Sequence, residues 1–340
     1  MKRHFERQAD YCSAFGADLT ARLLRQLSNC ICASSALGQR IFNWPGDPAP
    51  EADKLPLRLA GGLHALLLKG KARELALIYR KGAIADADMQ TLLQAVLQRH
   101  DAELTAFIEN APQTNEVRRA AGIIAAAHWL KAYNGCDLIA SELGASTGLN
   151  LLFDKFHLAL RDGYGPQNSP VQLTPKWQGP LPRPARFCLR DAQGCDLAPM
   201  DVKQPQGLLR LRSYIWPDQP ERLARTDAAI SLNPPLPQKS SAIEFLRQRF
   251  AQPWTGYHWI YSTVAWQYFS KGEKKDIAEL IATRGAASKS TLAWLRIEAD
   301  GNSPGTGMRL DLWPDQKRIE LGRMNFHGRW ITWAAPQLGH

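Results

Sequence analysis

Apolar residues recur at helical spacing throughout the first part of the chain. Leucines cluster on one side of the segments 15–32, 55–68 and 88–99, which predicts three amphipathic helices. The segment 43–50 is rich in proline and is expected to form a loop. Because no strand-like alternation interrupts this pattern, we expect a helical N-terminal cap domain over residues 1–110.

The pattern changes after Pro112. Thr114 is a good N-cap residue for a helix that continues through an alanine-rich stretch and ends at Asn134-Gly135. The apolar run 137–142 then predicts a buried strand, which is followed by a glycine-containing turn and a helix from Leu149. A strand–turn–helix of this kind is the repeating unit of a doubly wound sheet.

The remaining sequence predicts a second domain over residues 111–340, with the α/β fold of a Rossmann-like methyltransferase. Its sheet is expected to be mostly parallel, with a C-terminal antiparallel hairpin and a small β insertion at about 163–205. The strands expected after the insertion are 208–215, 257–263, 290–298, 309–313 and 319–333.

The strongest local signal is Glu142-x-Gly144-x-Ser146-x-Gly148 at the strand-to-helix turn. Glycines there let the backbone approach a ligand closely, and an acidic residue at a strand end accepts hydrogen bonds from a ligand's amine or hydroxyls. The spacing looks like the alternating form found in S-adenosylmethionine methyltransferases, with Ser146 in place of the central glycine. The cofactor contacts predicted around this turn are Glu142, Gly144, Ala145, Ser146, Gly148 and Asn150. The alternative is a tight turn that binds no ligand.

The same turn has a second chemical interpretation. Gly144-Ala145-Ser146-Thr147-Gly148 matches G-x-S-x-G, the nucleophile-elbow pattern of α/β hydrolases. Ser146 would then be the nucleophile, and His327 follows it in the order that a Ser–acid–His triad requires. Glu142 has a role in the cofactor interpretation and none in this one.

Two further strands decide whether a nucleotide sugar and base can be recognised. With 156–160 as the second strand, Asp162 becomes the candidate ribose-binding acid. The third strand is expected just before Asn233 or at 236–239, although prolines make the later position poor. Active methyltransferases often place an Asp after this strand, whereas this chain offers Asn233, Ser240 and Ser241.

Polar and aromatic residues beyond the fourth strand complete the predicted site. Ser262 and Thr263 are expected to face the cofactor, because ligands bind at the carboxyl ends of parallel strands. Residues expected to contact substrate are Asn115, Arg118, Arg212, Trp216, Gln267, Tyr268 and His327. Alternatively, helix capping, surface ion pairs and core packing account for these residues without a substrate.

Composition limits the classes of function. The chain has 340 residues, 45% of them hydrophobic and 22% charged, as expected of a globular protein without disordered character. No apolar run is long enough for a membrane span and no secretory signal is present, so we expect a cytoplasmic protein with reduced cysteines. The cysteine spacing predicts no metal site. The net charge of +10 favours anionic ligands or nucleic acid, with a solvated basic surface as the alternative.

The motif set as a whole resembles an uncharacterised bacterial family, domain of unknown function 2332. The resemblance covers nearly the whole chain and rests on segments 57–68, 114–118, 141–151, 212–219, 261–268, 293–298 and 326–330, with Asp154 and Arg222. It implies polar and aromatic residues arranged around a methyltransferase-like core, but no activity.

Four hypotheses follow. The first is an S-adenosylmethionine-dependent methyltransferase acting on a small or anionic substrate. The second is a non-catalytic ligand-binding protein on the same fold, which Ser146 and the missing third-strand Asp favour. The third is a serine hydrolase that uses Ser146, and the fourth is a nucleic-acid-binding protein, which only the charge supports.

Overall fold

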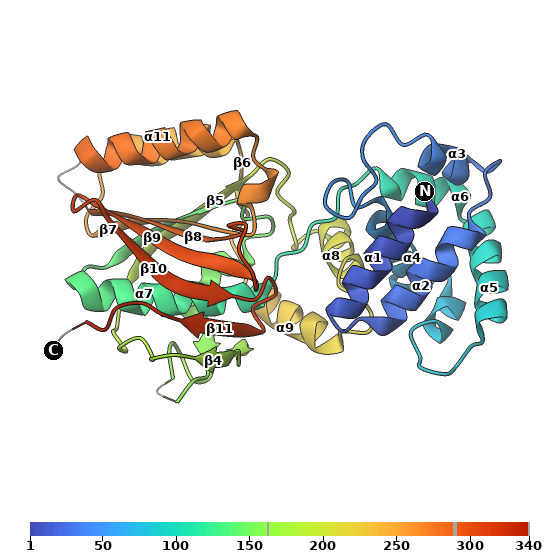
Figure 1. Ribbon diagram of the computed structural model, residues 1–340, viewed down its shortest axis with the longest axis horizontal. Helices are drawn as coiled ribbons and strands as arrows, with labels where there is room; N and C mark the ends of the chain where they lie inside the picture. The colour runs from blue at the N-terminus through green and yellow to red at the C-terminus, as the bar shows by residue number, and fades with distance from the viewer. Residues whose placement is uncertain (162, 288–290, 339–340) are drawn as a thin grey trace. The chain divides into compact units, whose positions relative to one another are not determined.

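The computed structural model describes residues 1–161, 163–287 and 291–338, and these residues form two compact units (Figure 1). The first unit comprises Met1–Thr114 and Val202–Ala224, and the second comprises Asn115–Asp201 and Arg225–His340. The sequence assigned 111–340 to a single domain, whereas by compactness the segment Val202–Ala224 belongs with the N-terminal helices. That 1–110 acts as a cap stays a prediction.

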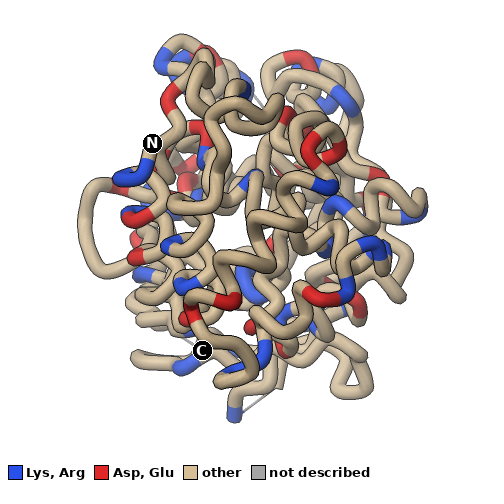
Figure 2. Tube along the Cα trace, turned by 90° about the vertical axis from the view of Figure 1, so that its right-hand side faces the viewer, with Lys and Arg blue, Asp and Glu red and all other residues tan. Residues whose placement is uncertain are grey.

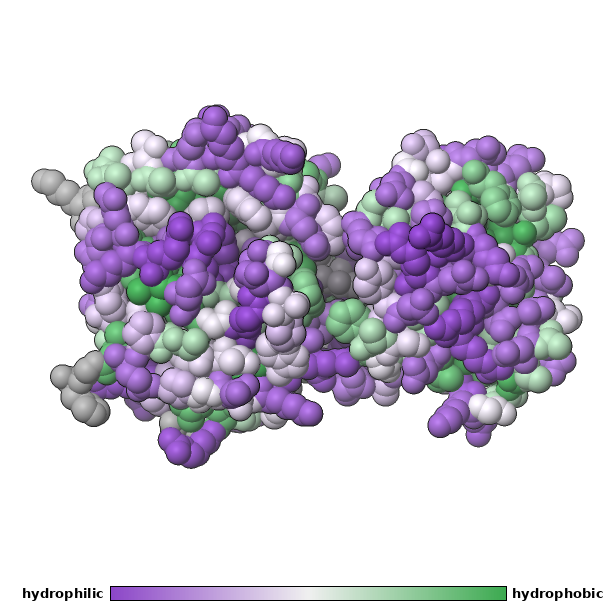
Figure 3. Space-filling view, in the orientation of Figure 1, coloured by the Kyte–Doolittle hydropathy of each residue, from purple (hydrophilic) through white to green (hydrophobic). Residues whose placement is uncertain are grey.

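The first unit is helical. Its helices are α1 (Lys2–Ala14), α2 (Asp18–Cys30), α3 (Ala36–Phe42), α4 (Leu55–Leu68), η1 (Arg73–Leu77), α5 (Asp86–Arg99), α6 (Asp101–Ile108) and α8 (Pro205–Ser213). The leucines that predicted three helices lie on α2, α4 and α5, and they pack into one core. Figure 3 shows hydrophilic residues over most of the viewed surface of this unit, as amphipathic helices require.

The expected strand at 208–215 is wrong, because most of this segment forms helix α8. Pro205 occupies the first turn of the helix, where proline's fixed φ is favourable. The helix packs on α4 so closely that a Cβ on Gly61 would lie 2.5 Å from the ring of Tyr214. The alternation of Arg and Leu that suggested a strand therefore reflects a short helix with only Leu211 and Ser213 buried.

The second unit confirms the expected α/β fold with a large, mostly parallel sheet. Among the described residues nine strands form this sheet, in the order β4-β11-β10-β9-β8-β7-β1-β5-β6. The strands are β1 (Leu138–Leu143), β4 (Lys176–Gln178), β5 (Leu189–Asp196), β6 (Gln238–Lys239), β7 (Tyr257–Thr263), β8 (Thr291–Glu298), β9 (Thr306–Trp313), β10 (Lys317–Met324) and β11 (Trp330–Trp333). Strands β6, β5, β1, β7 and β8 run parallel, and β8 to β11 alternate in direction.

Helices cover both faces of the sheet (Figure 1). On one face, α10 (Ala242–Ala251) and α11 (Lys271–Ala287) bury an apolar cluster that includes Phe245, Ile277 and Trp294. On the other face lies α7 (Ala120–Asn134), where a Cβ on Gly122 would lie 2.9 Å from Ile297. Short 3₁₀ turns η2 (Val117–Arg119), η3 (Leu149–Lys155) and η4 (Trp266–Tyr268) and helix α9 (Pro220–Ser231) complete the chain.

The expected second strand at 156–160 is wrong. Residues His157–Leu158 form β2, which pairs only with β3 (Gln172–Leu173) in a separate small sheet. The strand beside β1 is β5, which the sequence placed inside a β insertion. Its polar sequence, in which only Gly194 and Cys195 are buried, hides its place between β1 and the edge strand β6.

Strands β4 and β5 are close in sequence and far apart in the sheet. They occupy the first and eighth positions in the strand order, and only residues 179–188 connect them. This connection crosses the α7 face, where the backbone N–H of Ala185 donates to His128 Nδ1 at 3.0 Å. We call residues 179–188 the crossing segment.

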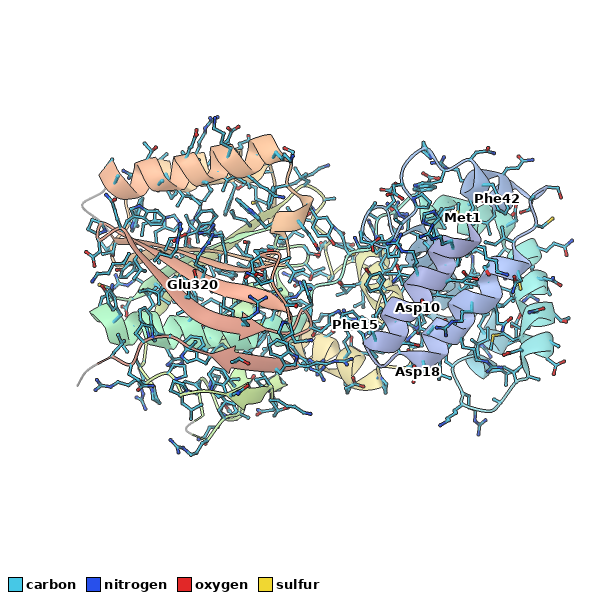
Figure 4. The ribbon with its side chains drawn as sticks, in the orientation of Figure 1. Met1, Asp10, Phe15, Asp18, Phe42 and Glu320 are labelled. Atoms are coloured by element: carbon cyan, nitrogen blue, oxygen red, sulfur yellow. The ribbon has the colours of Figure 1, made fainter. Side chains whose placement is uncertain are left out.

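The C-terminal part is larger than the expected hairpin. Strands β9, β10 and β11 form a three-stranded antiparallel meander, and β4 adds to it in parallel. Figure 4 labels Glu320 on β10, the strand in the middle of this meander. No helix within the described ranges is long and apolar enough to cross a membrane.

Candidate functional site

The strand order locates the candidate site. Numbered along the chain, the five parallel strands β1, β5, β6, β7 and β8 lie in the order 3-2-1-4-5, so the order reverses between β1 and β7. Ligands of open α/β sheets bind at the carboxyl ends of the strands at such a reversal point. The turn 142–148 and the residues after Thr263 lie at this edge.

Both loops at this edge hold residues in the left-handed backbone region. In the turn after β1, Gly144, Ser146 and Gly148 have φ values of 75°, 54° and 76°. After β7, Val264 has a φ of 54°. This conformation is strongly unfavourable for a β-branched residue, and such strain is concentrated at functional sites.

The glycines of the turn let protein segments approach one another. A Cβ on Gly144 would lie 2.7 Å from the Cβ of Ala265, and one on Gly148 would lie 2.2 Å from the carbonyl oxygen of Pro235. These contacts explain both glycines without a ligand. They fit the alternative of a tight turn that binds no ligand, and the expectation that the glycines let the backbone approach a cofactor stays a prediction.

Asp196 is the acid that ends the second parallel strand, and sequence reasoning missed it. Its Oδ2 accepts a hydrogen bond from the backbone N–H of Ser146 at 2.9 Å, and its Oδ1 accepts from Ala198 N–H at 2.9 Å. The position was predicted for Asp162, which lies outside the described residues. In the sequence, Asp196 could have been identified as the acidic residue that ends the run 189–196.

Glu142 is 1% exposed and lies at the end of β1. Burial raises the pKa of its carboxyl well above the usual value, and the charge of Asp196 adds to this, while Arg119 opposes it. Its Oε2 has no hydrogen-bond partner within the part of the chain that the structure describes. The environment therefore favours the protonated carboxyl, which donates a hydrogen bond as well as accepting one.

Two asparagines surround the turn. Asn115 Oδ1 accepts hydrogen bonds from Thr147 Oγ1 at 3.0 Å and from the backbone N–H of Leu149 at 2.9 Å. This side chain, predicted to bind substrate, holds the turn in place. Asn150 is fully buried and its Nδ2 donates to the carbonyl of Glu116, while its Oδ1 has no partner among the described residues.

Half-buried Arg119 and buried Glu298 both bind the loop after β7, and the sequence interpretation gave neither of them a role in the site. Arg119 donates from Nη1 to the carbonyl of Thr263 at 3.2 Å and from Nε to that of Phe326 at 2.9 Å. Glu298, the last residue of β8, accepts from the backbone N–H groups of Ala265 and Trp266 at 3.2 and 3.1 Å. Burial raises the pKa of Glu298 to about 7. Together the two side chains position the loop after β7.

The structure brings together some of the remaining predicted residues. Ser262 and Thr263 end β7 at the candidate site. The Ser262 side chain lies near Glu298 and acts to lower the pKa of its carboxyl, but its Oγ forms no well-aligned hydrogen bond in the described residues. A Cβ on Gly328 would lie 2.6 Å from the carbonyl oxygen of Arg118, so the turn that carries His327 abuts Arg118.

Other predicted residues lie elsewhere. Gln267 and Tyr268 form η4, and the Tyr268 side chain is 66% exposed. Arg212 and Trp216 belong to the helical unit rather than to the unit that holds the turn. The third parallel strand is β6, so the later of the two expected positions is correct and Ser240 follows it.

Four buried polar atoms at this edge share one property. None has a hydrogen-bond partner in residues 1–161, 163–287 or 291–338, and they are Glu142 Oε2, Ser146 Oγ, Asn150 Oδ1 and Ser262 Oγ. Buried polar atoms are nearly always satisfied in native proteins, by protein, water or ligand. Their concentration at the reversal point of the sheet marks the place where a ligand or ordered water supplies partners.

The arrangement gives less support to other chemistries. Ser146 Oγ contacts no histidine in the described structure, so the nucleophile-elbow interpretation has no visible general base. No group of three or more potential metal-ligating side chains occurs in the part of the chain that the structure describes. In the view of Figure 2, basic and acidic residues are interspersed rather than separated into a broad basic surface.

A model of the family described as "Uncharacterized protein conserved in bacteria (DUF2332)" matches residues 2–333. No curated protein and no solved structure matches the chain. Because the match covers nearly all of the sequence, the chain belongs to this bacterial family, DUF2332.

Proposed function

We propose that this protein binds S-adenosylmethionine at the carboxyl ends of β1 and β7 and transfers its methyl group to a substrate that is still to be identified. The observation that carries the proposal is the convergence of four unsatisfied buried polar atoms at the point where the strand order reverses. A ligand with an amino acid portion, a ribose and a base offers donors and acceptors to such a set.

The residues at the edge suggest how the cofactor is held. Asp196 takes the role first given to Asp162, because it ends the strand next to β1. Each of its oxygens already accepts one backbone N–H and retains a second lone pair for a ribose hydroxyl. Glu142, Ser146 and Ser262 provide the polar contacts nearer β1 and β7. S-adenosylmethionine supplies an electrophilic methyl group when bound, so the chain's own task is alignment and exclusion of water.

A non-catalytic ligand-binding protein on the same fold is the second candidate. It is favoured by the contact between Gly148 and Pro235, which fills space that a turn of this kind leaves for a ligand. The absence of an acid directly after β6, where Ser240 stands, points the same way.

The first experiment is calorimetric titration with S-adenosylmethionine and S-adenosylhomocysteine. We expect binding by the wild type and about tenfold weaker binding by Ser146→Ala, because the hydroxyl has no partner to lose except a ligand. Ser141→Ala is the matched control. Its hydroxyl lies on β1 but bonds to His258 and Arg249 at 2.8 and 3.0 Å, so affinity is expected to stay unchanged.

The outcomes separate the two candidates. Failure of both ligands to bind the wild type would remove the cofactor proposal. Binding with the expected Ser146 effect, but no transfer of labelled methyl groups to any component of a bacterial extract, would favour the non-catalytic protein. Equal effects of the Ser146 and Ser141 substitutions would move the binding site away from this turn.

A further inference from the structure

Strands β8 and β9 place two arginines directly opposite each other. In the antiparallel register Arg296 pairs with Arg309, and the preceding pair on the same face joins Trp294 to Asp311. Strand β10 adds Arg318 opposite Asp311 and Glu320 opposite Arg309. Like charges in directly opposed positions destabilise a sheet, so this pairing needs a compensating interaction.

The acidic side chains nearby compensate only part of this charge. Asp311 contacts both Arg296 and Arg318, with a distance of 2.7 Å between Arg318 Nε and Asp311 Oδ1. Glu320, labelled on β10 in Figure 4, stands opposite Arg309 in register and is exposed, yet Arg309 forms no ion pair with any residue that the structure describes. Within the described part of the chain, the Arg309 guanidinium therefore has no carboxylate in ion-pair contact.

Two buried donors remain unsatisfied at this place. The Nε atoms of Arg296 and Arg309 are buried and have no acceptor among the described residues. The Arg296 guanidinium lies 3.9 Å from the centre of the Trp294 ring, which fixes its plane. Burial and the charge of Arg309 lower the pKa of Arg296 to about 10, although Asp311 opposes this. An acceptor with negative charge is what this geometry lacks.

We infer that Arg296 and Arg309 bind a phosphate group on the β8–β9–β10 face of the sheet. Two planar guanidinium groups match a phosphate, which carries close to two negative charges at pH 7 and three acceptor oxygens. A carboxylate offers only two acceptor oxygens. Because Asp311 already contacts Arg296, the choice of phosphate rests on its larger number of acceptor oxygens, which can accept from both guanidinium groups at once. The phosphate belongs either to a phosphorylated small molecule or to free phosphate. The inference does not depend on the binding of S-adenosylmethionine.

The site lies close to the carboxyl end of β8. Arg296 is two residues before Glu298, whose carboxylate holds the loop after β7. Trp294, which stacks on Arg296, also packs against Trp266 of the same loop at a ring-centre distance of 5.5 Å. Phosphate bound here would contact side chains that position this loop.

The test uses the full-length protein with inorganic phosphate as the probe. We expect 10 mM phosphate to raise the melting temperature of the wild type by about 2–4 °C above sodium chloride of equal ionic strength. In Arg309→Gln this gain should be lost. Without phosphate the same variant should melt about 1–2 °C higher than the wild type, because the opposed charges have been removed.

Arg190→Gln is the matched control, since Arg190 is an exposed arginine of the same sheet that pairs with Asp137. It should keep the full response to phosphate. Titration followed by ³¹P NMR gives a second readout, in which Arg309→Gln should weaken phosphate binding about tenfold or more. Further titrations with acetate and with a simple phosphomonoester distinguish the ligand class and its source.

Three results would overturn the inference. One is a wild type that responds to phosphate no more than to chloride, and another is an Arg309→Gln variant that keeps the response. The third is stabilisation by acetate at least as large as that by phosphate, which would make the site a carboxylate site. Stronger binding of the phosphomonoester than of phosphate would identify a phosphorylated metabolite as the ligand.

Discussion

The Oδ2 atom of Asp196 accepts a 2.9 Å hydrogen bond from the backbone N–H of Ser146. The bond joins the end of the second parallel strand to the one residue of the β1 turn that has a side chain and a left-handed backbone. A charged acceptor thus stabilises the conformation in which the turn presents the Ser146 hydroxyl.

Asp196→Asn should destabilise the protein. The amide keeps one acceptor oxygen and turns its NH₂ toward the other backbone donor, so about 1.5–3 kcal/mol of unfolding free energy is expected to be lost. Urea unfolding measures the change. Asp276→Asn on α11 removes the same charge from an exposed position and should alter stability by less than about 0.5 kcal/mol. Equal effects in the two variants would contradict the role given to Asp196.

Gly148→Ala tests whether the turn glycine is needed for packing. A Cβ there meets the carbonyl oxygen of Pro235 at 2.2 Å, whereas one on Gly135, which has the same φ of 76°, meets nothing within 4 Å. Gly135→Ala should therefore cost only the left-handed penalty of about 1–2 kcal/mol. Gly148→Ala should cost about 1–3 kcal/mol more, because Pro235 must move. If denaturant unfolding gives similar losses for both, the contact with Pro235 is not a constraint.

The pattern of hydrophobic positions predicted those elements whose burial is uniform. Helix α4 has the bounds that its leucines indicated, and β7 is buried along its whole length. Strand β5 was missed because half of its side chains are polar and little of it is buried, although it lies beside β1. Periodicity in a sequence reflects which side chains are buried. A strand near the edge of a sheet buries too few side chains to produce a clear pattern.

Val264→Gly should stabilise the fold. Glycine adopts a φ of 54° without the steric strain of a β-branched residue, and this outweighs the lost contacts of a half-buried side chain. An increase of about 1 kcal/mol is expected in chemical denaturation. Asn233→Gly, at a φ of 58°, serves as comparison and should gain less, because asparagine tolerates this region. A destabilised Val264→Gly protein would show that the side chain's packing exceeds the strain.

Glu298→Gln should change how stability depends on pH. In the folded protein the pKa of Glu298 is about 7, above the ordinary value of 4.5. The contribution of Glu298 to the free energy of unfolding is therefore complete below pH 4.5 and is lost as the pH rises through about 7. Relative to the variant, the wild type should lose about 3 kcal/mol over this window. His128 and His258 have lowered pKa values and act in the opposite direction, but they are common to both proteins and cancel in the difference.

Urea unfolding of both proteins at pH 4.5, 5.5, 6.5 and 7.5 provides the comparison. A difference between the two stabilities that does not vary with pH would show that Glu298 keeps the same protonation state throughout.

The turn 142–148 was predicted at the end of β1, but the contacts that support it were not. The turn 142–148 was recognisable because closely spaced glycines between a strand and a helix indicate a turn with an unusual backbone conformation. Asp196, Arg119 and Glu298 were given no role in the site, because each acts on a residue more than thirty positions away. Neither helical nor strand periodicity carries information about such partners, which only the strand order brings together.

The crossing segment has a further consequence for the mechanics of the sheet. Seven strand spacings of about 4.8 Å separate β4 from β5, a span of roughly 34 Å. Eleven residue steps from Gln178 to Leu189, at about 3.1 Å each in the extended polyproline conformation, reach roughly the same length. Pro180, Pro182 and Pro184 favour that conformation. The segment is therefore almost fully extended, and its length limits the distance between the two sides of the sheet. Deletion of a single residue would strain the chain at both β4 and β5, whereas insertion of a residue would leave both strands in place.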